Sequence, residues 1–246
     1  LAMAAGLGDF SLQVQISTRL GRAYVFLGNY RRAIDFWKWT IASLKGEMLY
    51  ERFGMSAFQG PASRAHLALC SAELGQFNEG IGPGEEAIRI AEAVNHPQSI
   101  AVAYGLVGYL YLVKGDLAKA IPLLERAVEV CRTRQVPVQF PSEASSLGYA
   151  YLHSGRTAEA LTLLEEAVEV GAKIGVMFDQ SARVARLSEA YLLAGRMDAA
   201  IESAGHALKL SRDHTERGHE ASVLRLLGEI AAHKDPPDVG EAEDYY

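Results

Sequence analysis

The residues of this chain that could carry chemistry are scattered, and none falls at a spacing that a catalytic or metal site needs. The phosphate-binding GxxxxGK[ST], the dinucleotide-binding GxGxxG, the hydrolase GxSxG and the zinc-binding HExxH motifs do not occur. His214 and His219 lie five residues apart with a glycine between them, whereas a helical zinc pair needs a spacing of four and a third ligand. Adjacent glutamates such as Glu165 and Glu166 diverge on a helix and indicate a solvated face. We therefore predict no catalytic residue, no metal and no cofactor.

Composition excludes further classes of function. The net charge of −6 over 246 residues argues against nucleic-acid binding, because phosphate contacts need clustered Lys and Arg. No run of about 18 uncharged apolar residues is present, so we expect no membrane contact. Cys70 and Cys131 lie far apart in the sequence, each in an apolar segment, which indicates buried reduced thiols and a cytoplasmic protein.

The strongest pattern is an internal repeat. A glycine that follows an apolar stretch recurs as Gly28, Gly75, Gly115, Gly155 and Gly195, at intervals of 47, 40, 40 and 40 residues. Periods of 20 to 50 residues indicate solenoids. The chemistry of this chain must therefore be sought on the surface of a repeated scaffold.

Each repeat is predicted to hold two helices. The glycine takes the left-handed conformation that ends the first helix, and Asp116 and Thr157 are candidate N-caps for the second. Apolar residues then recur at helical spacing, as in DLAKAIPLLERAVEV (residues 116–130), and β-strand alternation is absent. We predict an all-α fold, a right-handed α-solenoid of antiparallel helix pairs.

Small residues mark where these helices meet. One position of each first helix holds a small residue: Gly21, Ala68, Gly108, Gly148 and Ser188. One position of each second helix holds alanine, at Ala33, Ala120, Ala160 and Ala200, with Gly80 as the exception. A tyrosine stands three residues after four members of the first set, at Tyr24, Tyr111, Tyr151 and Tyr191, and Ser71 is the exception. We expect these tyrosines to pack in the core with each hydroxyl at its edge.

This pattern of small residue, tyrosine, glycine and Ala-Ile or Ala-Leu resembles the tetratricopeptide repeat (TPR) over nearly the whole chain, with a period of 40 in place of 34. Stretches such as KGDLAKAIPLLERAVEVCR and RGHEASVLRLLGEIAAHKDPPDVGEAE resemble the C-terminal TPR region of bacterial signalling proteins that carry an adenylate or guanylate cyclase domain and a predicted AAA-type or STAND ATPase. The resemblance implies that any cyclase or ATPase activity lies in domains outside this chain, which we expect to be non-enzymatic.

The repeats are expected at residues 10–45, 58–95, 98–134, 140–174, 178–213 and 217–246, the last one incomplete. The seven extra residues of the first interval predict an inserted loop over residues 46–61, which either folds back over the solenoid or forms a contact surface. Gly80, Gly82, Pro83 and Gly84 predict a weak or kinked start of a second helix.

Neither end of the chain carries the polar cap that solenoids normally have, so we expect an excerpt from a longer array whose ends can self-associate.

The resemblance to TPR arrays implies a concave groove lined by the first helices. Its candidate lining residues are Arg22, Phe26, Glu73, Tyr109, Leu112, Tyr149, His153 and Glu189. The chaperone-tail type of TPR clamps a carboxylate with a Lys three residues before the small position. In five repeats Thr18, Ala65, Gly105, Ser145 and Ala185 stand there, which argues against such a clamp.

Three functions remain open. The first is a protein- or peptide-binding scaffold, the sensor or interaction segment of a larger bacterial signalling protein, whose partner could be another part of the parent chain. The second is a regulatory receptor for a small molecule or short signal peptide held between repeats three and five, around Tyr109 and Tyr149. The third is a passive spacer or oligomerisation element.

Overall fold

The computed structural model describes residues 2–176, 178–234 and 236–245, and all regular structure among them is helical. The α-helices, in chain order, are α1 (Ala2–Gly6), α2 (Phe10–Phe26), α3 (Tyr30–Ser43), α4 (Gln59–Glu73), α5 (Phe77–Val94), α6 (Pro97–Val113), α7 (Leu117–Thr133), α8 (Phe140–His153), α9 (Thr157–Lys173), α10 (Gln180–Leu193), α11 (Met197–Asp213), α12 (Arg217–Ala232) and α13 (Val239–Tyr245). A 3₁₀ helix, η1, covers Gly46–Tyr50. The predicted all-α class is confirmed.

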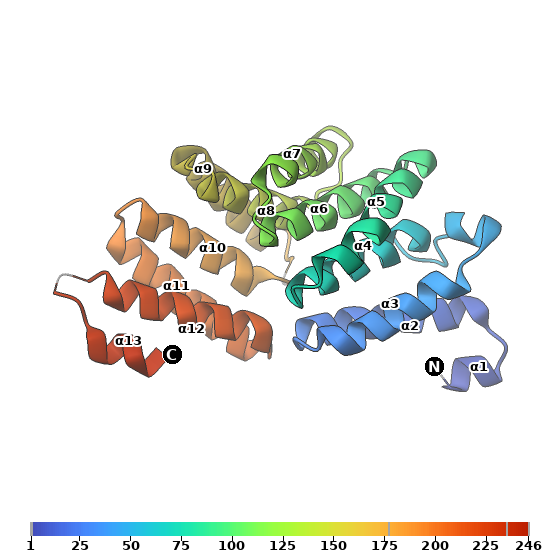
Figure 1. Cartoon of the computed structure of the whole chain (residues 1–246), viewed down its shortest axis with the longest axis horizontal. Coiled ribbons are helices and arrows are strands. Elements are labelled where there is room, and N and C mark those ends of the chain that lie inside the picture. Colours follow the sequence, from blue (N-terminus) through green and yellow to red (C-terminus); the bar gives the residue numbers. More distant parts are fainter. Residues whose placement is uncertain (1, 177, 235, 246) are drawn as a thin grey trace. The chain divides into compact units, whose positions relative to one another are not determined.

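Two compact units divide the chain, one of residues 1–25 and 29–139 and the other of residues 26–28 and 140–246. Within the first unit, α4 packs on α5 and α6, and α6 on α7 (Figure 1). Within the second unit, α8 packs on α9, α10 on α11, and α12 on α13. Each unit is therefore built from helices that pack in adjacent pairs, as the repeat predicts.

The turn inside each pair is closed by the predicted glycine. Gly28, Gly75, Gly115, Gly155 and Gly195 all have φ between 69° and 82°, and each second helix begins two residues later. Only glycine adopts this conformation without steric cost. The glycine period therefore fixes where every second helix starts.

The N-caps of the second helices match the prediction at one of two positions. Asp116 accepts a hydrogen bond from the Lys119 amide at 3.3 Å. Thr157 was predicted as the second cap, and this prediction is wrong, because Thr157 is already the first residue of α9 and Arg156 precedes it.

A second set of left-handed turns joins one pair to the next. Asn95, Gln135, Gly175 and Thr215 have φ values of 52°, 55°, 72° and 59°. These positions are also 40 residues apart, although only one of them is glycine. The repeat therefore has a fixed backbone geometry at both of its turns.

Small residues let the paired helices approach closely. A Cβ atom added at Gly21 would lie 2.7 Å from the Trp37 ring, and one at Gly108 or Gly148 would lie 2.7 Å from Leu124 or Leu164. The alanines of the second helices are fully buried at the same contacts, at Ala33, Ala120, Ala160 and Ala200. The fold therefore depends on side-chain volume at these positions.

The tyrosine ladder packs against the same contacts and also carries a repeated electrostatic feature. Tyr111 is buried, and the other three rings are partly buried. A cationic side chain lies over each ring, in the pairs Arg32–Tyr24, Lys119–Tyr111, Arg156–Tyr151 and Arg196–Tyr191. The cation–π contact covers one face of each ring.

The glycine-rich start of α5 differs from its prediction. The helix is continuous over Phe77–Val94 and includes Pro83 in its interior. A Cβ atom at Gly80 would come within 2.7 Å of Leu110 and 3.2 Å of the Ala68 backbone, so α5 lies unusually close to α4 and α6. Packing outweighs low helix propensity here.

The inserted segment is partly helical. Its first residues form η1, and Gln59 onward already belongs to α4, so the loop prediction for residues 46–61 fails at both ends. Buried polar contacts fix the segment to the helices, because Thr18 donates to the Gln59 side chain at 3.0 Å and the Phe58 amide donates to Ser99 at 3.0 Å. The segment thus folds back onto the first unit.

Candidate binding surfaces on the first helices

The predicted groove residues lie on first helices of both units and differ in exposure. Arg22 and His153 are exposed, and Phe26, Glu73, Tyr109, Tyr149 and Glu189 are partly buried. Leu112 is 7% exposed, so its prediction as a lining residue is wrong: it packs inside the first unit.

In the first unit the structure brings together Tyr109 of α6 and Glu73 of α4. The Tyr109 hydroxyl donates to Glu73 Oε1 at 2.5 Å. This charge-assisted hydrogen bond fixes both side chains on the surface of the two neighbouring first helices.

In the second unit Tyr149 of α8, which is equivalent to Tyr109, pairs with Glu189 of the following first helix α10; Glu189 occupies a different repeat position from Glu73. The Tyr149 hydroxyl donates to Glu189 Oε2 at 3.0 Å, and the His153 ring meets the Tyr149 ring edge-on at a centroid distance of 4.4 Å. Burial and the adjacent Glu189 carboxylate raise the pKa of Tyr149 to about 12. Tyr149 therefore stays protonated and acts as a hydrogen-bond donor.

Two arginines complete the Tyr149–Glu189 surface, and neither was among the predicted site residues. Arg186 of α10 lies over the Tyr149 ring at 5.4 Å from its centroid and donates to Ser145 and Ser146 of α8 at 3.2 and 3.3 Å. Arg225 of α12 pairs with Glu229. Burial alone would lower the pKa of Arg225, but the Glu229 and Glu189 carboxylates outweigh it and raise the pKa.

Arg225 also corrects the argument against a carboxylate clamp, which rested on the absence of a cation three residues before the small residue of each repeat. It stands three residues before Gly228, the small residue of the sixth repeat, at the position where five earlier repeats have no cation. The sixth repeat was not counted, although the period of 40 would have found Arg225. Its pairing with Glu229 leaves it compensated within α12.

A second polar cluster lies at the start of α10 and α12. Ser181 is fully buried and donates to Glu216, which is 3% exposed; the Nδ1 atom of His219 lies 3.2 Å from the Ser181 hydroxyl and 3.3 Å from Glu216. A serine hydrolase needs both imidazole nitrogens, one toward the acid and one toward the serine. Here a single nitrogen meets both partners, so the cluster holds two helices together and is no catalytic triad.

Cys70 and Cys131 are both buried, as predicted. Burial raises the pKa of Cys70 to about 12, so this thiol is protonated and unreactive at neutral pH. Among the residues that the structure describes, no three His, Cys, Asp or Glu side chains gather as metal ligands would. None of the described helices is both long enough and apolar enough to cross a bilayer.

The inserted segment forms a hollow of about 720 Å³ in the first unit. Its lining combines Ser11 of α2 with Tyr50, Glu51, Arg52, Phe53, Gly54, Met55, Ser56 and Phe58. Phe53 has a φ of 50° and packs edge-on against Phe10, with 5.8 Å between ring centroids. The hollow is separate from the tyrosine–glutamate pairs.

Family models match three parts of the chain, which include Tyr109, Tyr149 and Glu189. Residues 101–134, 144–174 and 184–214 match models described as tetratricopeptide repeat. These three segments are tetratricopeptide repeats. Neither model describes a catalytic family. A search of curated protein sequences found no match.

Solved structures support the same fold. A putative kinesin light chain with nearly identical TPR-like repeats from Podosopora anserina is 21% identical, with a TM-score of 0.55 over 85% of this chain and 99% of that chain. A Rap protein complexed with Competence and Sporulation Factor is 14% identical, with a TM-score of 0.70 over 95% and 67%.

A third structure is larger than this chain. The Signal Transduction ATPase with Numerous Domains (STAND) protein with a tetratricopeptide repeat sensor from Pyrococcus horikoshii is 16% identical, with a TM-score of 0.61. The match covers 93% of this chain and 34% of that protein. At these identities the likeness concerns the fold.

Proposed function

We propose that this chain is a non-catalytic scaffold that binds a protein or peptide on its first helices. The observation that carries the proposal is that two equivalent tyrosines each donate to a glutamate of a neighbouring first helix, Tyr109 to Glu73 in one unit and Tyr149 to Glu189 in the other. Each pair holds a partly exposed aromatic ring in a fixed orientation beside a carboxylate. Rigid aromatic side chains of this kind are efficient anchors for a partner, because little conformational entropy is lost on binding.

We further propose that the chain is the sensor or interaction segment of a larger bacterial signalling protein. The support is the STAND protein, in which a tetratricopeptide repeat sensor accompanies other domains. An excerpt of a longer array with self-associating ends also remains a proposal. The expected position of the last repeat ends at residue 246, which lies outside the described residues.

The alternative is a receptor for a small molecule or short signal peptide. It is favoured by the likeness to a Rap protein that was solved with Competence and Sporulation Factor. In this alternative the Tyr149 surface, with Arg186 and Glu189, contacts the ligand through both charges and the ring.

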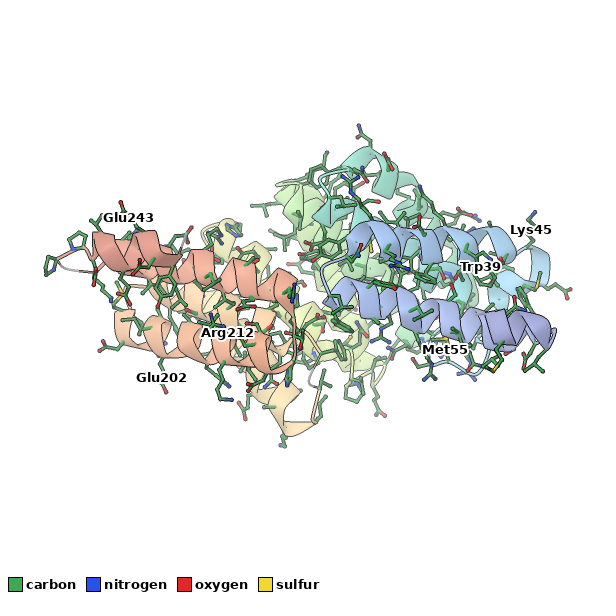
Figure 2. The ribbon with its side chains drawn as sticks, turned by 90° about the horizontal axis from the view of Figure 1, so that it is seen from below. Trp39, Lys45, Met55, Glu202, Arg212 and Glu243 are labelled. Atoms are coloured by element: carbon green, nitrogen blue, oxygen red, sulfur yellow. The ribbon has the colours of Figure 1, made fainter. Side chains whose placement is uncertain are left out.

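Site-specific photo-crosslinking tests the scaffold. A benzophenone amino acid is placed at position 109, 149 or 202 of the full chain, which is then irradiated in a bacterial host lysate. Glu202 is an exposed residue of the second helix α11 and serves as the control (Figure 2). We expect one protein to be crosslinked from positions 109 or 149 and not from position 202.

Two results would reject the scaffold. Crosslinking of the same proteins from all three positions would mean that contact is not specific to the first helices. No crosslinked protein from positions 109 and 149 would favour the small-molecule receptor.

A further inference from the structure

The outer face of α3 differs in charge from the rest of the molecule. Residues 30–45 carry a net charge of +3 in a chain whose net charge is −6. We define the α3 outer face as the exposed residues Arg31, Arg32, Lys38, Trp39 and Lys45. Figure 2 shows Trp39 and Lys45 on this helix and just beyond its end. Arg31 and Lys38, seven residues apart, share one side of the helix.

Comparison with the other second helices shows that this face is exceptional. Because every second helix begins two residues after its left-handed glycine, equivalent positions can be matched directly. Ten residues after that glycine, Lys38 stands where the other repeats have Glu85, Glu125, Glu165 and Gly205. The next position has Trp39 where the others have Glu86, Arg126, Glu166 and His206. A cation and an indole thus replace mainly acidic side chains.

Arg32 lies over the Tyr24 ring, but the other cations of this face have no acidic partner among the described residues. In the described part of the chain Arg31, Lys38 and Lys45 form no ion pair, and Asp35, the single acid of the segment, joins none. Trp39 is 36% exposed. Tryptophan and arginine are enriched among the residues that dominate protein interfaces.

We propose that the α3 outer face binds an acidic protein segment that packs an apolar side chain against Trp39. Arg31 and Lys38 lie about 10 Å apart along the helix axis. An acidic helix with carboxylates seven residues apart matches this distance, and an apolar residue next to one of its carboxylates meets Trp39, which directly follows Lys38. This surface is separate from the tyrosine–glutamate pairs, so the proposal goes beyond the proposed function.

Two other anionic partners fit the face less well. Nucleic acid requires many phosphate contacts, and a chain with net charge −6 offers here only a short row of cations. A helix that lies on a bilayer buries its apolar face in lipid. The apolar residues of α3, Ala33, Ile34 and Trp37, are already buried in the core of the first unit, which leaves one indole for the membrane.

A designed peptide pair tests the proposal. One labelled helical peptide carries glutamates seven residues apart with a leucine next to one of them, and its partner has glutamine at both glutamate positions. Binding to the full chain is measured by fluorescence anisotropy at low and at physiological salt. We expect the glutamate peptide to bind, and Lys38→Glu and Trp39→Ala each to weaken binding at least tenfold. Higher salt should also weaken it.

Arg89→Glu is the matched control variant. Arg89 is an exposed residue of α5, and the substitution changes the net charge by the same amount as Lys38→Glu. We expect it to leave binding unchanged, and circular dichroism confirms that each variant is folded.

Several results would overturn the proposal: no binding of the glutamate peptide, equal binding of the glutamine peptide, or the same loss for Arg89→Glu as for Lys38→Glu. Tighter binding of duplex DNA or of phosphatidylserine vesicles, lost in Lys38→Glu, would reject an acidic protein segment and assign the face to that partner.

Discussion

Gly148 and Gly205 both lie inside helices, but their surroundings are opposite. A Cβ atom at Gly148 would lie 2.7 Å from Leu164 and 3.3 Å from the Ala160 carbonyl oxygen. A Cβ atom at Gly205 would have no neighbouring atom within 4 Å. We expect Gly148→Ala to destabilise the fold by about 1–3 kcal/mol through overpacking. Gly205→Ala should stabilise it by up to about 1 kcal/mol through helix propensity. Urea unfolding of both variants checks this, and equal effects would contradict it.

The cluster of Ser181, Glu216 and His219 gives the second unit a pH dependence. Burial opposes the charge on His219, but its hydrogen bond to Glu216 outweighs burial and raises the pKa above its ordinary 6.5. Burial likewise acts to raise the pKa of Glu216, and the hydrogen bonds from His219 and Ser181 lower it below 4.5. The contribution of His219 to the free energy of unfolding is complete below pH 6.5 and is lost as the pH rises through its raised pKa. The contribution of Glu216 to the free energy of unfolding is complete above pH 4.5 and is lost as the pH falls through its lowered pKa.

We therefore expect His219→Gln to cost most stability between pH 4.5 and 6.5, by about 1–2 kcal/mol, and less at alkaline pH. Thermal unfolding at both ends of this range and at alkaline pH measures the difference. Arg186 and Asp179 also act on His219, so Ser181→Ala serves as a second variant that leaves those charges in place. A cost for His219→Gln that does not change with pH would show that the imidazole only fills space.

At the scale of the elements, the turns between pairs offer a matched test. Gln135 and Gly175 occupy equivalent left-handed positions, with φ of 55° and 72°. The left-handed conformation costs a residue with a Cβ atom about 1–2 kcal/mol. We expect Gln135→Gly to stabilise the chain by about 1 kcal/mol and Gly175→Ala to destabilise it by a similar amount, as measured by urea unfolding. Two changes of the same sign would contradict this reading of the turns.

These turns also show what the sequence can and cannot predict. The glycines from Gly28 to Gly195 are visible because glycine is the residue that such turns favour, so the helix pairs follow from their period. The other turns were missed because Asn95, Gln135 and Thr215 are not glycine. The start of α5 was predicted to be weak from propensity alone, although close packing on Leu110 requires its glycine. Arg186 was missed because its contacts join different helices, and Arg225 was missed because the sixth repeat was not counted.

At the scale of the whole molecule, the two units predict local responses to damage. Repeats contact only their neighbours, so strain in one repeat spreads to adjacent repeats and fades beyond them. We expect Gly148→Ala to reduce amide hydrogen-exchange protection in α8, α9 and α10 and to leave α2 through α5 unchanged. Mass spectrometry of peptide fragments measures this. A uniform loss over the chain would show that it unfolds as one cooperative body.

Because both turns recur every 40 residues, a block of 40 codons in the gene can be removed or duplicated as a unit. Val136 and Val176 follow equivalent left-handed turns, are both 6% exposed, and donate their amides to Cys131 and Gly171 at 3.1 and 2.9 Å. Excision of the codons for residues 136–175 would place Val176 directly after the turn that now precedes Val136. Duplication of the same block would place a second copy of Val136 directly after the turn that now precedes Val176. Recombination can therefore shorten or lengthen the array by one repeat without inventing a junction, so partner-binding surface can be gained or lost in a single genetic step.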